Sequence, residues 1–131
     1  DLQQLAVIQE LCRREFSDLE IVPCPLIRDV DGLALSSRNV RLTSKDRLVA
    51  LELNRTLNRL KAAVNKSKGG GIDLDSERIA LDGNDDLELE YLAIIDAESF
   101  EEVGESKFNE GHAVIAAQVG SVRLIDNLFM G

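Results

Sequence analysis

The chain has 131 residues, enough for one domain with a modest core and too few for two full-sized domains. Its formal charge of −9, from 24 acidic and 15 basic residues, argues against duplex DNA and anionic membranes as partners. Aromatic residues make up 4% with no Trp, which also argues against a stacking surface for single-stranded nucleic acid.

The shares of apolar and charged residues, 44% and 30%, are typical of a soluble globular protein. The sequence shows no signal-peptide pattern and no apolar run of membrane-spanning length. Its two cysteines, Cys12 and Cys24, make neither a disulfide framework nor a zinc-ligand spacing. We therefore expect a cytoplasmic protein with reduced thiols, without a metal site, and without membrane or nucleic-acid partners.

The first predicted elements are a helix and a strand. Apolar residues at spacings of three and four predict an amphipathic helix over residues 1–16: Leu5, Ile8, Cys12 and Phe16. Branched apolar residues predict a short strand over residues 19–24, which ends between two prolines. A helix followed by a strand is one unit of an α/β fold. Because the chain opens at Asp1 directly in helical periodicity, we expect it to be a piece of a longer protein.

Residues 26–43 are predicted to be irregular, and a long helix follows them. Thr43 or Ser44 can cap that helix, with Asp46 reaching back in a capping box, and its apolar stripe continues to about Val64. The glycine-containing run over residues 66–71 then ends the helix as a linker.

The remaining elements favour a small antiparallel sheet. We expect a short helix over 72–82, strands over 87–96, 112–119 and 122–129, and a helical turn over 100–103. In the first strand, Leu87, Leu89 and Tyr91 should share one face. Gly120 and Ser121 separate the last two strands and indicate a tight hairpin. The long helix should pack on this sheet.

The segment with the most chemical character is Ser36-Ser37-Arg38-Asn39. Two hydroxyls and a guanidinium supply hydrogen-bond donors suited to phosphate oxygens. The same tetrad also makes a good loop and helix cap, and composition alone leaves both interpretations open.

Three motifs resemble the pantothenate synthetase (pantoate–β-alanine ligase) family. Residues 24–39, C-P-L-I-R-D-V-D-G-L-A-L-S-S-R-N, are similar to its signature, whose usual form has Met in place of Leu35. The opening D-L-Q-Q-L-A resembles the end of the family motif G-E-K-D-[FY]-Q-Q-L, and residues 122–127, V-R-L-I-D-N, resemble its final strand. Residues 66–86 match poorly and are interpreted as a variable loop. The resemblance is to the carboxy-terminal part of the family.

This resemblance implies a fold and a reaction. The family belongs to the nucleotidyltransferase superfamily, acts in the coenzyme A pathway, and uses ATP with Mg²⁺ to join pantoate to β-alanine. The products are pantothenate, AMP and pyrophosphate. Residues 1–25 would end a Rossmann-like nucleotide-binding domain, and residues 26–131 would form an α+β lid domain with the long helix on the antiparallel sheet. The complete enzyme would be a homodimer.

The resemblance also implies site residues. The stretch Leu35, Ser36, Ser37 and Arg38 would hold the ATP phosphates, with Ser36, Ser37 and Arg38 acting in catalysis. Ile27 would contact adenosine through its backbone, Asp1 the ribose, and Gln4 pantoate. Without the resemblance, Asp1 is interpreted as a helix cap, Gln4 as an exposed helix residue, and Ile27 as core.

Two family features have no counterpart in this sequence. The H-I-G-H-like histidines and the lysine before the aspartate of the first motif should lie upstream of Asp1, so the chain by itself is expected to be inactive. His112 lies in a predicted strand away from the phosphate segment and is interpreted as an ordinary surface or core histidine. Since its tetrad is polar, the 26–43 segment is expected to be mobile. The alternative function is a non-catalytic, self-associating or partner-binding module.

Overall fold

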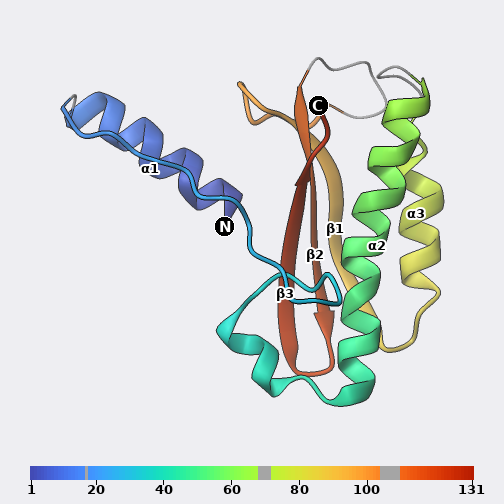
Figure 1. The fold of residues 1–131 in the computed structure, drawn as a ribbon. Coiled ribbons are helices and arrows are strands. Elements are labelled where there is room, and N and C mark those ends of the chain that lie inside the picture. Colours follow the sequence, from blue (N-terminus) through green and yellow to red (C-terminus); the bar gives the residue numbers. More distant parts are fainter. Residues whose placement is uncertain (17, 68–71, 104–109) are drawn as a thin grey trace.

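The computed structural model describes residues 1–16, 18–67, 72–103 and 110–131. A three-stranded sheet carries two helices on one side, and a third helix projects away from it (Figure 1). Within the described residues, none of the helices combines the length and hydropathy that a membrane span requires. The elements in chain order are α1 (Leu2–Glu15), the 3₁₀ helix η1 (Ser37–Arg41), α2 (Ser44–Ser67), α3 (Leu74–Asp82), β1 (Leu87–Asp96), β2 (Gly111–Val119) and β3 (Val122–Phe129).

The antiparallel sheet has the strand order β1-β2-β3, as predicted. Val119 pairs with Val122, so Gly120 and Ser121 form the two-residue hairpin loop. Gly120 has φ +55, a conformation that glycine adopts without steric cost. Within this sheet, β3 is therefore an edge strand, and it is the strand beside which the irregular segment lies.

The long helix α2 packs on the sheet, as predicted, and α3 lies beside it against β1 (Figure 1). The helix begins with the predicted capping box, because the Asp46 N–H donates to Thr43 Oγ1 at 3.1 Å and the Thr43 hydroxyl donates to the Asp46 carboxylate at 2.8 Å. The core lies between the helices and the sheet, and its largest fully buried side chains include Leu57, Ile72, Leu92, Ile94 and Ile115.

The predicted faces of β1 are wrong after its third residue. A register shift separates Leu89 from Tyr91, and Tyr91 is 38% exposed while Leu92 is buried. A bulge adds one residue to the strand, and this moves every later side chain to the opposite face. Tyr91 therefore does not share the face of Leu87 and Leu89.

The helical turn predicted over 100–103 is also wrong. The Asp96 carboxylate accepts hydrogen bonds from the N–H groups of Glu98 and Ser99, at 3.0 and 2.8 Å, and closes a turn earlier in the chain. The chain then returns in extended form, with Glu102 bridging to Ile95. An aspartate that caps its own turn competes with helix formation.

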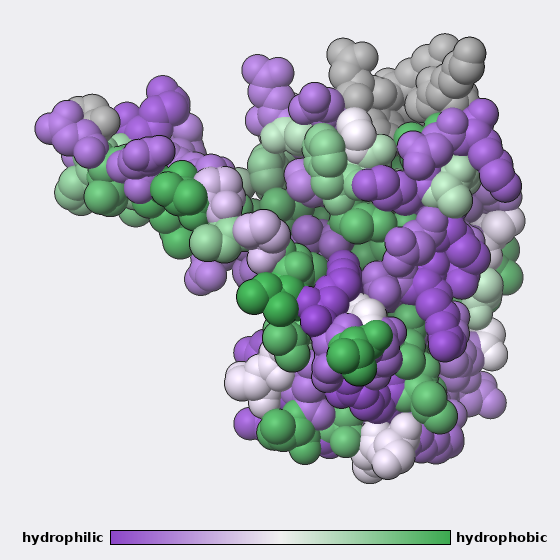
Figure 2. Space-filling view, viewed as in Figure 1, coloured by the Kyte–Doolittle hydropathy of each residue, from purple (hydrophilic) through white to green (hydrophobic). Residues whose placement is uncertain are grey.

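The helix α1 is confirmed, but the strand predicted over 19–24 is not formed. No described segment pairs with residues 19–24, and a strand without a partner leaves its backbone donors and acceptors to water. The structure therefore confirms the mixture of helices with an antiparallel sheet of three strands. Figure 2 shows apolar side chains along one side of α1. Val7 and Leu11 in α1, and Phe16 at its C-cap, are more than half exposed.

Candidate functional site

The segment between α1 and α2 folds into a narrow loop beside β3. Arg28 bridges to Ala34, the Leu35 N–H donates to the Ile27 carbonyl at 2.9 Å, and the Asp29 N–H donates to the Leu33 carbonyl at 2.8 Å. The turn passes through Gly32, whose φ of +95 suits glycine. Leu33, immediately after it, is 5% exposed and joins the hydrophobic core. We call residues 27–35 the anchored loop.

A buried ion pair ties the anchored loop to β3. The Arg28 guanidinium donates to both carboxylate oxygens of Asp126, at 2.7 and 2.8 Å. Their side chains are 22% and 4% exposed. This geometry is the bidentate pairing that arginine makes with carboxylates.

A second arginine ties the loop to α2. The Arg47 guanidinium donates to Asp31 and to Asp29, each at 2.8 Å. The hydrogen bond from Arg47 holds the pKa of Asp31 below its ordinary value. The anchored loop therefore has charged contacts to two different elements, β3 and α2, and neither contact was predicted from the sequence.

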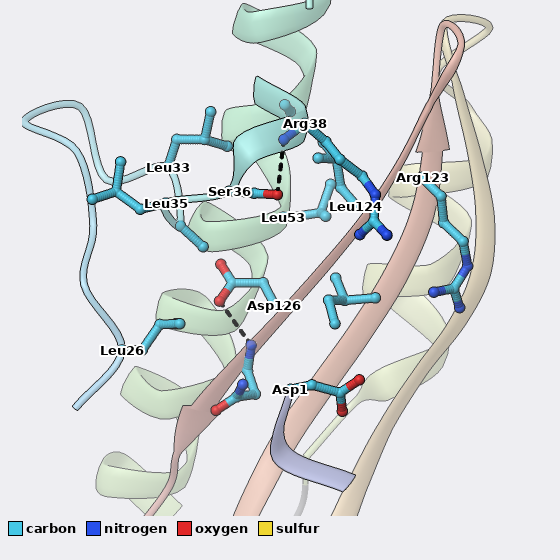
Figure 3. Close-up of a pocket in the computed structure, with 14 residues that line it drawn as sticks. Asp1, Leu26, Leu33, Leu35, Ser36, Arg38, Leu53, Arg123, Leu124 and Asp126 are labelled. Atoms are coloured by element: carbon cyan, nitrogen blue, oxygen red, sulfur yellow. Dashed lines mark hydrogen bonds between the residues drawn. The ribbon is translucent and has the colours of Figure 1, made fainter. Parts of the chain in front are cut away.

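The Ser-Ser-Arg-Asn tetrad follows the loop and starts η1. Ser36 is the N-cap, because its Oγ accepts the Arg38 N–H at 3.2 Å (Figure 3). The Asn39 side-chain amide donates to the Ala34 carbonyl at 2.9 Å. The interpretation of the tetrad as a loop and helix cap is thus confirmed, and it leaves the side chains of Ser37 and Arg38 exposed.

A cavity of about 250 Å³ lies between the anchored loop, α2 and β3. Of the residues predicted from the family resemblance, it brings together Asp1, Leu35, Ser36 and Arg38. In Figure 3 the Arg38 side chain extends from η1 toward β3, and the Asp126 carboxylate points from β3 toward the loop. A cavity that combines apolar walls with a few convergent polar groups is typical of a small-molecule site.

The other predicted residues do not line this cavity. Ile27 is 67% exposed, so its interpretation as core is wrong. Its carbonyl accepts the Leu35 N–H within the loop. Gln4 is exposed on α1, and its N–H donates to the Asp1 carboxylate at 3.1 Å. Asp1 is therefore a helix cap, as one interpretation predicts, and it also borders the cavity.

The neighbouring surface is rich in guanidinium groups. Arg38, Arg41 and Arg123 border a second hollow of about 270 Å³ at the β2–β3 hairpin. Arg123 is paired with Glu90 at 2.7 Å, which raises the pKa of Arg123. Within the described residues, Arg38 and Arg41 have no ion-pair partner. Two unneutralised cations thus stand at the edge of the site in a chain of net charge −9.

His112 lies outside this site. Its ring packs against Phe129 at a tilt of 55°, with 5.1 Å between ring centroids, and within the described part of the chain its Nδ1 has no hydrogen-bond partner. Burial lowers the pKa of His112. His112 is a strand residue packed against its neighbour and away from the site, as expected, but the expectation that its polar atoms are satisfied fails at Nδ1.

Comparison with known proteins identifies the family. The model of the family described as pantoate–β-alanine ligase matches residues 1–129. The chain belongs to the pantoate–β-alanine ligase family. A pantothenate synthetase from Rubrobacter xylanophilus is 42% identical over 97% of this chain, and one from Campylobacter curvus is 37% identical over 99%. The resemblance inferred from the motifs is confirmed.

Solved structures of pantoate–β-alanine ligases agree with the fold. The pantothenate synthetase of Thermus thermophilus superposes on 96% of the chain with a TM-score of 0.84 and 33% identity. The Francisella tularensis pantoate–β-alanine ligase, complexed with "beta-gamma ATP" and β-alanine, covers 98% with a TM-score of 0.68 and 27% identity. The chain spans 44% and 46% of the two curated relatives above and 45% of the Thermus chain.

The charged residues that hold the loop in place were not predicted from the sequence. Arg28 lies inside the 24–39 motif and Asp126 inside the 122–127 motif, but they are 98 residues apart. The available signal was a charged residue among apolar residues in each motif. Because buried charges in proteins are usually paired, it could have indicated that the two residues are partners.

Proposed function

We propose that this chain is the carboxy-terminal part of a cytoplasmic, homodimeric ligase that condenses pantoate with β-alanine at the expense of ATP. One observation carries the proposal: Asp1, Leu35, Ser36 and Arg38 meet in one cavity although they come from α1 and the segment before α2. The Francisella relative, complexed with an ATP compound and β-alanine, supports it. As a nucleotidyltransferase-superfamily enzyme, it would take ATP as its Mg²⁺ complex.

In the proposed first step, a pantoate carboxylate oxygen attacks the α-phosphorus of ATP, and the bond to the pyrophosphate oxygen breaks. Negative charge grows on the departing pyrophosphate. Arg38 and the hydroxyls of Ser36 and Ser37 would donate to those oxygens, and preorganised donors of this kind lower the barrier. The exposed guanidinium of Arg38 is free for this role among the described residues.

The binding roles are carried over from the family motifs, and of the four residues concerned only Asp1 and Leu35 line the cavity. The backbone of Ile27 would hold adenosine, Asp1 the ribose, Leu35 the polyphosphate beside Ser36, and Gln4 pantoate. In the second step, the β-alanine amine would attack the carbonyl carbon of pantoyl-adenylate, AMP would leave, and the amine would lose a proton. Alignment of the two reactants dominates such a step.

The domain assignment is part of the same proposal. Residues 1–25 would belong to a Rossmann-like domain whose other elements lie in the rest of the protein. The exposed apolar side chains of α1 would pack on that domain, and residues 26–131 would act as its lid. The cavity beside α1 would then lie between two domains, a common place for a ligand.

Release of AMP tests the proposal directly. The complete protein should form AMP only when ATP, pantoate and β-alanine are all present. The 131-residue chain alone should form none, because it lacks the family's histidine motif. Absence of pantoate-dependent AMP from the complete protein would refute the function. Turnover by the chain alone would refute the division of the site between domains.

A second candidate function, a non-catalytic self-associating module, is favoured by the apolar side of α1 (Figure 2). Exposed apolar patches are typical of interaction surfaces. Light scattering on the purified chain measures this: a stable oligomer that dissociates on Val7→Asp with Leu11→Asp would support the module.

A further inference from the structure

The ion pair between Arg28 and Asp126 has more contacts than a simple salt bridge. Besides its two bonds to Asp126, the Arg28 guanidinium donates to the carbonyls of Gly32 at 3.1 Å and Asn127 at 3.2 Å. The Asp126 carboxylate also accepts the Asn127 N–H at 2.7 Å. These hydrogen bonds fix the position of the guanidinium, because it is bonded to the loop on one side and to β3 on the other.

Stability alone does not explain such a pair. Removing two charges from water is costly, and an apolar pair of similar volume often stabilises a fold as well or better. Asp126 stands among core residues of the sheet, opposite Ile115, where an apolar side chain would fit the pattern of the strand. The charge therefore points to a positional role.

The position of Arg28 in the loop defines that role. Arg28 follows Ile27 and bridges to Ala34, which precedes Leu35. Leu35 and Ile27 are joined by the 2.9 Å backbone hydrogen bond of the next pair. Arg28 thus lies where the two arms of the loop pair with each other. In the proposed function, the arm with Ile27 contacts adenosine, and the arm with Leu35 leads into the polyphosphate contacts.

We infer that the Arg28–Asp126 pair is a positioning device for ATP. It fixes the base of the anchored loop against β3 and so sets the separation between the adenosine contact at Ile27 and the polyphosphate contacts at Ser36 and Arg38. Arg28 does not line the cavity, and the carboxylate of Asp126, which does, is engaged by Arg28, so both residues would act through the position of the loop. This inference rests on the proposed function. It adds that one residue pair controls the rate of the first half-reaction, pantoyl-adenylate formation, but not the rate of the second, the attack of β-alanine.

Two variants of the complete protein test the inference. Asp126→Asn keeps the shape of the side chain and removes its charge. Arg28→Lys keeps the charge but cannot span two carboxylate oxygens and two carbonyls with one ammonium. Each should raise KM for ATP and lower the rate of pantoyl-adenylate formation by about 10- to 100-fold, as expected when reacting groups are misplaced by about 1 Å. The reaction of preformed pantoyl-adenylate with β-alanine should keep its wild-type rate.

The matched control is Glu77→Gln. The Glu77 carboxylate accepts a hydrogen bond from the Arg59 guanidinium at 2.7 Å, and this pair joins α3 to α2 outside the cavity. It should lower Tm without changing KM for ATP. This separates the loss of an ion pair from the loss of loop position.

The outcomes distinguish the inference from the function. If the wild-type protein forms no pantoyl-adenylate, the proposed function fails. If it does, the inference is overturned by a wild-type KM and adenylation rate in Asp126→Asn. It is also overturned if both half-reactions slow equally, because that result indicates general damage to the fold. Should Asp126→Asn not fold, Arg28→Lys decides by the same comparison of the two half-reactions.

Discussion

In the proposed reaction, Arg38 is the main donor to the negative charge that develops on the pyrophosphate. Its guanidinium is exposed, borders two hollows, and has no ion-pair partner within the described residues. In the complete protein, Arg38→Ala should therefore reduce the rate of single-turnover adenylation. The expected loss of transition-state stabilisation is about 2–4 kcal/mol, as for other preorganised donors.

A control for Arg38→Ala is available in the middle of α2. Arg55 is an exposed arginine paired only with Glu52 among the ion pairs of the described residues, and it lines no described cavity. Arg55→Ala should leave adenylation unchanged. Equal adenylation rates in the wild type and Arg38→Ala would remove Arg38 from the site.

Two glycines give opposite predictions. Gly120 has φ +55, and a Cβ added there would lie 3.1 Å from the Asp46 carboxylate. Gly120→Ala should destabilise the protein by about 1–2 kcal/mol, the penalty of a left-handed alanine. Gly83 has φ −72 and a Cβ there would make ordinary contacts, so Gly83→Ala should stabilise by about 0.4–1 kcal/mol. Urea unfolding followed by circular dichroism measures both, and a shared sign would contradict the argument.

At the scale of the elements, the helix cap of α2 can be tested separately from its packing. Thr43→Ala removes the hydroxyl that accepts from the Asp46 N–H and donates to its carboxylate. The free energy of unfolding should fall by about 1 kcal/mol, the usual contribution of a capping residue. Ser44→Ala, one position later, is the matched control and should change it by about 0.5 kcal/mol or less. Similar losses in both variants would show that the cap is not the source.

Elements with a long, regular pattern could be predicted from the sequence. The stripe of α2 and the three strands depend on local periodicity, and the hairpin depends on Gly120. The prediction of a strand over 19–24 was wrong because a β-strand needs a second strand to pair with, and no described segment of this chain supplies one. The prediction of a helical turn over 100–103 was wrong because Asp96 closes a different turn. The predicted face of Tyr91 was wrong because a β-bulge cannot be recognised in the alternation of apolar and polar residues.

The site could be predicted only in part. The motifs located Leu35, Ser36 and Arg38 together with Asp1, and the structure places these residues around one cavity. Their roles toward ATP stay predictions. The pair of Arg28 with Asp126 could not be derived from local pattern, because two residues 98 positions apart meet only through the fold.

At the scale of the whole molecule, the chain consists of a packed body and a peripheral helix. The body contains the sheet, α2, α3 and the anchored loop, which contributes Leu33 to the hydrophobic core. The helix α1 depends largely on local contacts: Asp1 caps it, and hydrogen bonds from Arg13 and Arg14 lower the pKa of Glu10 to about 2. The chain spans 45% of the Thermus thermophilus relative and 40% of the Francisella tularensis relative.

The burial of Leu33 has a consequence for the timescale on which the loop opens. Surface loops exchange their amide hydrogens through small local fluctuations, whereas core amides exchange only when the fold opens globally. Because Leu33 belongs to the core and Arg28 is fixed to β3, the amides of Asp29 and Leu35 should exchange as slowly as those of the sheet. Amides of α1 should exchange much faster. Hydrogen–deuterium exchange of the isolated chain measures this, and rapid exchange at Leu35 would instead support the prediction that residues 26–43 are mobile. A slow loop would mean that ATP meets a site already formed, so the chain would not have to order this segment on each turnover.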